Sequence, residues 1–374
     1  MRQPREIMEK LMNGLVPPQR IPYRITIPPA FYERMEDEAA APLSQVYHFD
    51  WGYREFIPKM RGKAPLDTPW DIQPDNEEQQ NYLNSRFAEY LPKQKPEGLR
   101  VSEYGIISVP GSMHHLRKMI HPLANATTVE ELENYPWPDM TQSWRWEDLE
   151  KDIKIASDQG YYLIGCLYYI YEAAWYIRGQ EQLMIDFYEN PEFAHRLFDK
   201  IADIQEYVAV RLAKLGVDCL TASDDIAHQQ GLIMKPEHIC KWILSRWQRV
   251  INAAKEINPK IKVNFHTDGK CQEIIADLMS IGVTAINPVQ PECDDPEFLK
   301  RKFGKELVLF GTVSANALSF GTPDEVRSEV KRRMETAKRY GGIFITPNNC
   351  PDINTPYENF KAFLDACQEY GRVE

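Results

Sequence analysis

The sequence predicts an α/β fold, a (β/α)8 TIM barrel with an irregular N-terminal extension. From about residue 140, short apolar runs alternate with amphipathic helical stretches, a pattern typical of βαβ units and a parallel sheet. Six such strand candidates follow one another in a single run, which favours a barrel whose remaining strands lie in the N-terminal half. Neither GxGxxG nor GxxxxGKS/T follows any of them, so a nucleotide-binding doubly wound sheet is disfavoured.

The predicted elements are short strands separated by helices that carry recognisable start and stop signals. The strands are Tyr161–Cys166, Val217–Ala222, Ile261–Phe265, Val283–Asn287, Leu307–Phe310 and Gly342–Thr346. The helices between them are predicted at 180–188, 191–215, 236–257, 271–281 and 323–340. The last helix follows Thr322-Pro323 and has two acids in its first turn, which is a strong N-terminal signal. Glycines stand where three of the helices should stop, at Gly216, Gly282 and Gly341.

The first 100 residues or so lack clean periodicity and are rich in Pro, Trp, Tyr and charge. Stretches such as VPPQRIPYRITIPP, FDWGYREFIPKM and KAPLDTPWDIQPD are typical of loops and short helices. We therefore predict an N-terminal extension or cap at 1–100, packed on a barrel at 101–374.

Composition narrows the possible partners. The 374 residues are 43% hydrophobic and 26% charged, with a formal net charge of −11, which is typical of a globular protein. An acidic surface has no general attraction for phosphate backbones or anionic lipid. The sequence therefore predicts no nucleic acid partner and no membrane partner.

The cysteine pattern and the N-terminus predict a cytoplasmic protein. Seven cysteines are scattered without CxxC spacing, so they do not form a disulfide framework. The first 20 residues are charged throughout and lack the apolar core of a signal peptide. No stretch approaches the roughly 18 apolar residues of a spanning helix.

Chemically active side chains follow five of the six predicted strands. In a barrel the active site lies at the carboxyl ends of the strands, so these residues should meet at one mouth. The sets are YYIYE after Cys166, SDDIAH after Ala222, HTDG after Phe265, NPVQ closing the fourth strand and NNCPD after Thr346. We predict substrate contacts from Tyr168, Tyr169, Asp224, His228, Asn287 and Gln290.

A metal site is predicted from residues on two of these loops. His266 and Cys350 supply an imidazole and a thiolate, the ligands that zinc prefers, and Asp268 could be a third. Three protein ligands with one open position are typical of catalytic zinc. The alternative is that His266 hydrogen-bonds a neighbouring loop, Asp268 caps a helix and Cys350 is a buried thiol.

Two further carboxylate positions are candidates for proton transfer. Asp224 and Asp225 are adjacent, so in an extended segment only one of them should face the pocket. The other role open to either is a helix N-cap. Glu172 lies among aromatic residues after the first predicted strand, and a salt bridge to Arg178 is its structural alternative. We predict Asp225 and Glu172 as the catalytic acids or bases.

With these residues in view, the chain resembles the uroporphyrinogen decarboxylase superfamily from about residue 105 to the end. The similarity is densest in HPLANATTVEELENYPWPD, YEAAWYIRGQEQLMIDFYENPE, SDDIAHQQGLIMKPE, NFHTDGK, GVTAINPVQPE, FGKELVLFGTVSANALSFGTPDEV and GGIFITPNNCPDINTPYENFKAF. Together these segments are specific, whereas each alone would be weak. The resemblance implies a TIM barrel, in agreement with the strand pattern, and a homodimer.

Two activities occur in that superfamily, and the resemblance favours one. Its decarboxylases carry an N-terminal arginine-rich segment that holds the substrate carboxylates, and the first 35 residues here do not show it. A substrate with many carboxylates needs clustered arginine, and no predicted strand end supplies any. Its cobalamin-dependent methyltransferases bind zinc through His-x-Cys and a later Cys. The matching residues are His266 and Cys350, with Asp268 where the thiol-activating members carry cysteine.

The resemblance to the methyltransferase branch implies a zinc enzyme with a corrinoid (cobalamin) protein as partner. A small methyl donor, for which a methoxylated aromatic is our expectation, would pass its methyl group to the cobalt, as in O-demethylation. Asp268 in place of cysteine argues against a thiol substrate. Two alternatives remain: a decarboxylase that needs no metal, and a non-catalytic protein that binds a tetrapyrrole or a corrinoid.

Overall fold

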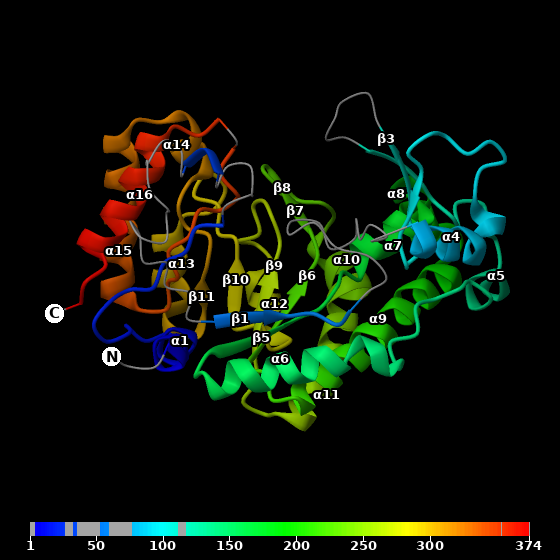
Figure 1. Cartoon of the computed structure of the whole chain (residues 1–374), viewed down its shortest axis with the longest axis horizontal. Coiled ribbons are helices and arrows are strands. Elements are labelled where there is room, and N and C mark those ends of the chain that lie inside the picture. The colour runs from blue at the N-terminus through cyan, green and yellow to red at the C-terminus, as the bar shows by residue number, and fades with distance from the viewer. Residues whose placement is uncertain are drawn as a thin grey trace.

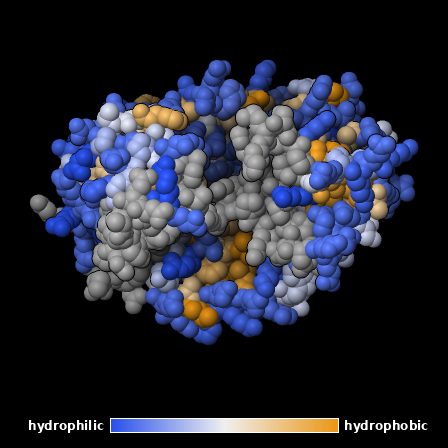
Figure 2. Space-filling model, turned by 45° about the horizontal axis from the view of Figure 1, so that its top comes forward, coloured by the Kyte–Doolittle hydropathy of each residue, from blue (hydrophilic) through white to orange (hydrophobic). Residues whose placement is uncertain are grey.

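A computed structural model of the chain describes residues 4–26, 33–35, 53–59, 77–110, 117–352 and 354–373. Figure 1 shows a central sheet flanked by helices, with a smaller group of strands and helices to one side. The face in Figure 2 is mostly hydrophilic, with small apolar areas. In the part of the chain that is described, no helix is both long and apolar enough to cross a membrane.

The central sheet has six parallel strands in the order β1-β5-β6-β9-β10-β11. Their bounds are β1 Tyr53–Phe56, β5 Tyr162–Cys166, β6 Cys219–Ser223, β9 Lys262–His266, β10 Ala285–Asn287 and β11 Val308–Leu309. Five of the six predicted strands are therefore confirmed, each to within two residues at either end. Their register brings Ser223, His266 and Asn287 side by side.

Two further extended segments complete the ring beyond β11. Leu309 forms a parallel bridge to Ile343, and Ile345 forms one to Tyr23. The sixth predicted strand, 342–346, thus makes isolated bridges instead of a ladder. Gly342 begins it with a φ of 61°, and Pro347 follows it without an N–H to donate. The fold is a (β/α)8 barrel, as predicted.

Helices alternate with the strands and cover the outside of the sheet (Figure 1). Those between the strands are α7 Tyr171–Arg178, α8 Gln180–Glu189, α9 Pro191–Lys214, α10 Pro236–Ile239, a π-helical turn Cys240–Leu244, α11 Ser245–Ile257, α12 Ile275–Ser280, α13 Pro296–Phe303, α14 Ala315–Phe320 and α15 Pro323–Tyr340. The C-terminal helix is α16 Tyr357–Tyr370. The helix predicted at 271–281 is shorter, because Cys271 and Gln272 donate their N–H groups to Asp294 instead of joining it.

The predicted start of α15 is a capping box. The Thr322 side chain accepts from the N–H of Glu325, whose carboxylate accepts from the Thr322 N–H. Both otherwise orphaned donors are satisfied. Gly341 ends this helix with a φ of 68°, as the sequence predicted.

The N-terminal segment contributes to the barrel itself. Strand β1 pairs with β5, although its sequence, YREF, lies in a stretch read as loop or short helix. Helix α1, Pro4–Met12, puts Met8, Leu11 and Met12 against the inward side chains of the strands, so it closes the amino end of the barrel. The predicted division at residue 100 stays a prediction.

The group beside the barrel comes from residues 77–110 and 117–133, among those that the structure describes. Strands β2 Arg100–Val101, β3 Ile107–Pro110 and β4 Arg117–Ile120 make an antiparallel sheet. Helix α4 Glu77–Arg86 contacts β2, and α5 Val129–Glu133 contacts α9. Helix α6 Glu147–Asp158 runs along β1 and β5 of the barrel. A last pair, β7 Ala227–His228 and β8 Gly231–Leu232, is a short hairpin between β6 and α10.

Candidate functional site

A cavity of about 510 Å³ opens at the carboxyl ends of the strands. Much of its polar and sulfur-bearing lining comes from strand ends and the residues just after them: Cys166 and Tyr169 from β5, Ser223 and Asp225 from β6, His266 and Asp268 from β9, Asn287 from β10, and Thr346, Asn348, Asn349 and Cys350. The volume is in the usual range for a small-molecule site. The barrel mouth is therefore the candidate active site.

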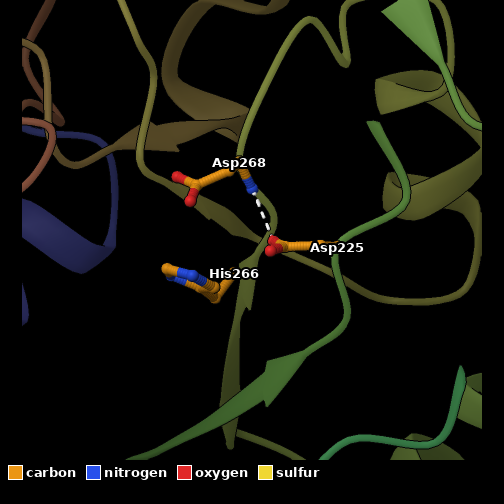
Figure 3. A group of neighbouring side chains, drawn as sticks. All are labelled: Asp225, His266 and Asp268. Carbon is orange, nitrogen blue, oxygen red and sulfur yellow. Dashed lines mark hydrogen bonds between the residues drawn. The ribbon is translucent and has the colours of Figure 1, made fainter. Parts of the chain in front are cut away.

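Three side chains in this cavity converge on one point. One ligand atom from each of Asp225, His266 and Asp268 lies within 4.8 Å of the other two. Figure 3 shows the three side chains grouped at the end of β9, with the Asp268 N–H donating to an Asp225 carboxylate oxygen at 2.9 Å. All three are half-buried. An imidazole and two carboxylates are a donor set that suits zinc, and solvent or substrate could take the open position.

The local sequence explains why these groups meet. His266 is the last residue of β9, and its strand partner on β6 is Ser223, two positions before Asp225. The φ of +88° at Gly269 turns the chain back after Asp268. A Cβ at Gly269 would lie 2.6 Å from the His228 backbone, so only glycine lets the β7–β8 hairpin approach this closely.

The electrostatics of the group favour a bound cation. Burial raises the pKa of Asp268; the Asp225 carboxylate adds to that rise, and His266 opposes it. Two carboxylates a few ångströms apart repel one another in a partly desolvated site. A cation between them would relieve this repulsion.

Asp224 lies outside the cavity and serves the fold. It is fully buried and accepts N–H bonds from Ile170, Tyr171 and Glu172, at 2.8 to 3.1 Å from one oxygen. Its other oxygen accepts from the Trp247 indole at 2.7 Å. We therefore assign Asp224 to capping α7 instead of the predicted substrate contact. The expectation that one member of the acidic pair faces the pocket is confirmed.

Glu172 lies behind Asp225 and outside the cavity lining. It is 5% exposed, and its carboxyl accepts from the Asp225 N–H at 3.4 Å. Burial, followed by the charges of Asp225 and Asp224, raises its pKa to about 9, so it holds a proton at neutral pH. Its structural alternative, a salt bridge to Arg178, is absent from the described residues, because Arg178 pairs with Asp186.

The other predicted substrate residues divide into two groups. Tyr169 and Asn287 line the cavity. Tyr168 is packed in the core against Tyr104, and His228 is exposed on the β7–β8 hairpin. Gln290 instead accepts the Gly269 N–H at 2.7 Å, so it holds the loop after β9 that carries Asp268.

Cys350 lines the same cavity but stands outside the group of three. Its sulfur is not among the ligand atoms that lie within 4.8 Å of one another. It is half-buried and follows Asn349, whose side chain accepts the Cys350 N–H at 2.7 Å. The predicted ligation by Cys350 stays a prediction, and Asp225 is a ligand candidate that the sequence did not indicate.

Sequence reasoning also missed a wall built by the N-terminal segment. Arg24, Tyr53 and Glu55 line the cavity, and the Arg24 guanidinium donates to the Tyr53 hydroxyl and lies 3.4 Å from Glu55. The expectation that no strand end supplies arginine is therefore wrong for Arg24. The sequence signals for this wall were the short segments PYR and YREF, which the surrounding prolines and glycine obscure.

An aromatic face lies beside this wall. Phe310 and Phe344 are stacked with ring centroids 5.3 Å apart, and Tyr53 meets Phe344 edge-on at 5.9 Å. All three line the cavity. The mouth therefore combines aromatic rings with a cluster of groups that could hold a metal ion.

Comparison with known proteins supplies the family. A model described as uroporphyrinogen decarboxylase (URO-D) matches residues 120–370. A uroporphyrinogen decarboxylase from Ruthia magnifica subsp. Calyptogena magnifica is 27% identical over 192 residues, which cover 50% of this chain and 52% of that protein. This chain thus matches about half the length of that relative.

A solved structure matches the whole fold. The methyltransferase from Methanosarcina mazei aligns over 99% of both chains, with a TM-score of 0.63 and 17% identity, a likeness of fold. The family match spans the strands from β5 onward, together with the loops that carry Asp225, His266, Asp268 and Cys350. The chain belongs to the uroporphyrinogen decarboxylase (URO-D) family.

Proposed function

We propose that this protein is a zinc-dependent methyltransferase that moves a methyl group from a small methoxylated donor to the cobalt of a corrinoid protein. The observation that carries the proposal is the convergence of Asp225, His266 and Asp268 at the barrel mouth. The fold likeness to a methyltransferase over the whole chain supports it. A decarboxylase would not need such a group.

The donor set fits zinc. Carboxylate oxygen and imidazole nitrogen are both zinc ligands, and catalytic sites keep one position open. A zinc ion held by His266 with Asp268, and with Asp225 or Cys350, would stabilise the negative charge that develops on the leaving oxygen.

The chain's own residues would position the donor and supply a proton. Phe310 and Phe344 offer a stacked face on which a flat ring can lie. Glu172, with a pKa of about 9, holds a proton at neutral pH directly behind Asp225. In this proposal Asp225 faces the cavity, and Glu172 behind it is the proton donor.

Metal content tests the proposal. Purified protein should carry close to one zinc per chain, and His266→Ala should lose it while staying folded. Asp225→Asn and Cys350→Ala then show which side chain completes the site, because the true ligand variant should bind zinc at least about tenfold more weakly. Wild-type protein that takes up no zinc, even when zinc is supplied, would refute the proposal.

A measurement of methyl transfer is the second test of the proposal. With zinc present, a methoxylated aromatic and a reduced corrinoid protein should give the spectral change of methylated cobalt, and His266→Ala should not. A zinc-loaded protein without this change, tested over several methoxylated donors, would leave the metal site standing and remove the methyl transfer.

A decarboxylase remains the second candidate, because Arg24 stands in the cavity wall and the curated relative is a uroporphyrinogen decarboxylase. One arginine already bonded to Tyr53 and Glu55 is a poor match for a substrate with many carboxylates. Release of carbon dioxide from a porphyrinogen by metal-free protein, retained in His266→Ala, would favour this alternative.

A further inference from the structure

A second cavity, of about 550 Å³, opens at the opposite end of the barrel. Its lining includes Tyr162 at the start of β5, Lys262 at the start of β9 and residues of α1. These are amino ends of strands, so this cavity shares no lining residue with the barrel mouth. In TIM barrels the amino end usually serves stability. An excess of one kind of charge at that end therefore calls for an explanation.

The lining of this cavity contains a set of lysines that form no salt bridge with a carboxylate. Lys255, Lys260 and Lys262 all line the cavity. Among the residues that the structure describes, no salt bridge involves any of the three. Lys255 donates to the Gly282 carbonyl at 3.2 Å. In a chain with a net charge of −11, three unpaired cations in one cavity oppose the general trend of the surface.

The two carboxylates in the lining are already used. Glu9 lies 2.9 Å from the Arg5 guanidinium, which also donates to Asp218. The other Asp218 oxygen accepts the Leu163 N–H at 2.9 Å. These acids both bind Arg5, and Asp218 also holds the start of β5. One arginine and three lysines against two carboxylates leave the lining with an excess of positive charge.

Two of these lysines, Lys255 and Lys262, interact electrostatically. Lys255 is half-buried, and burial lowers its pKa, with the charge of Lys262 as the second cause. A bound anion would remove this repulsion and replace the water lost from the ammonium groups. Lysine binds phosphate groups as a compact point charge with three donors.

We propose that this cavity binds a small multivalent oxyanion, such as a diphosphate or a polycarboxylate. The ligand lies between Lys255 and Lys262, with Lys260 at the rim. The size of the cavity suits a small molecule, and the net charge of −11 on the chain disfavours a nucleic acid. Strand β9 runs from Lys262 at this site to His266 at the mouth, so one rigid element joins the two sites.

Titration calorimetry with inorganic pyrophosphate tests the proposal. Low ionic strength is needed because salt screens exposed charges within about 10 Å. Wild-type protein should bind one pyrophosphate per chain. Lys255→Gln/Lys262→Gln should bind at least about tenfold more weakly, since two charge-assisted contacts to the anion are lost. Citrate in place of pyrophosphate distinguishes a polycarboxylate from a phosphate ligand.

A matched control has the same charge change elsewhere. Lys331→Gln/Lys338→Gln on α15 removes two lysines that do not line this cavity and should keep wild-type affinity. If the double variant at the cavity fails to fold, Lys260→Glu serves instead, because Lys260 is exposed and its reversal should weaken binding. Absence of saturable binding below a Kd of about 1 mM, or an equal loss in the α15 control, would overturn the proposal. Neither outcome bears on the zinc site.

Discussion

Replacement of Asp224 by asparagine tests whether Asp224 stabilises the fold while its neighbour Asp225 serves the cavity. One carboxylate oxygen lies 2.8 to 3.1 Å from three successive N–H groups at the start of α7, and an amide oxygen can keep these bonds. The other oxygen, 2.7 Å from the Trp247 indole nitrogen, becomes an NH₂ group that faces another donor. Asp224→Asn thus loses a buried, charge-assisted bond and the negative charge at a helix start.

The expected loss in unfolding free energy is about 3 kcal/mol. A hydrogen bond to a charged group contributes roughly 1.5–3 kcal/mol, and a partly buried charge at a helix N-terminus up to about 2 kcal/mol. Burial offsets part of this sum, because it raises the pKa of Asp224 to about 7 and so disfavours the charged form. Urea unfolding followed by fluorescence and circular dichroism measures the difference.

Trp247→Phe supplies the control for the mechanism. It removes the indole donor, so Asp224→Asn should be less destabilising in that background, with a coupling energy of about 1.5 kcal/mol. The neighbouring Asp225→Asn should cost less than about 1 kcal/mol of stability while it changes zinc affinity. An Asp224→Asn protein within about 0.5 kcal/mol of wild type, or a cycle without coupling, would refute the reasoning.

Three further changes test other parts of the fold. Gly269→Ala should destabilise by about 2 kcal/mol or more, because its Cβ would meet the His228 backbone; a thermal melt unchanged from wild type would contradict this. Thr322→Ala removes a capping box and should cost about 1 kcal/mol, measured by urea unfolding, whereas Thr322→Ser should be close to neutral. Contact with Arg196 and a nearby lysine lowers the pKa of Glu133 from 4.5 to about 2, so its stabilisation is present above pH 4.5 and lost as the pH falls toward 2. Glu133→Gln should therefore cost about 1 kcal/mol at neutral pH, after allowance for solvent screening, and a gap from wild type that does not narrow between pH 5 and pH 3 would be inconsistent with this.

The regular half of the barrel could be predicted from the sequence because its patterns are local. Strand β9 is an apolar run that ends at His266, and α15 carries its own cap and stop signals. These features depend on neighbours within a few residues. The meeting of Asp225, His266 and Tyr169 at one mouth then follows from the rule that parallel strands end on the same side.

The remaining site could not be predicted because it depends on long-range contacts. Strand β1 is four residues long, and only its pairing with β5 makes it a strand. Asp225 and Cys350 are both chemically suitable as ligands, and only the register of the loops separates them. Asp224 looks like its neighbour in sequence, yet Trp247 and the start of α7 decide its role.

The closure of the ring by Tyr23 and Ile345 has a consequence for how the molecule assembles. These residues are about 320 positions apart in the chain, and the bonds from Ile21 to Gly371 and from Val373 to Gln19 extend the same seam. Contacts of such separation form late, since the loop entropy must be overcome first. On the ribosome, the segment around Arg24 must therefore wait for the final segment before it can take its place in the cavity wall. Until these contacts form, Phe310 and Phe344 lack that part of the wall, and transiently exposed apolar surface of this kind favours aggregation.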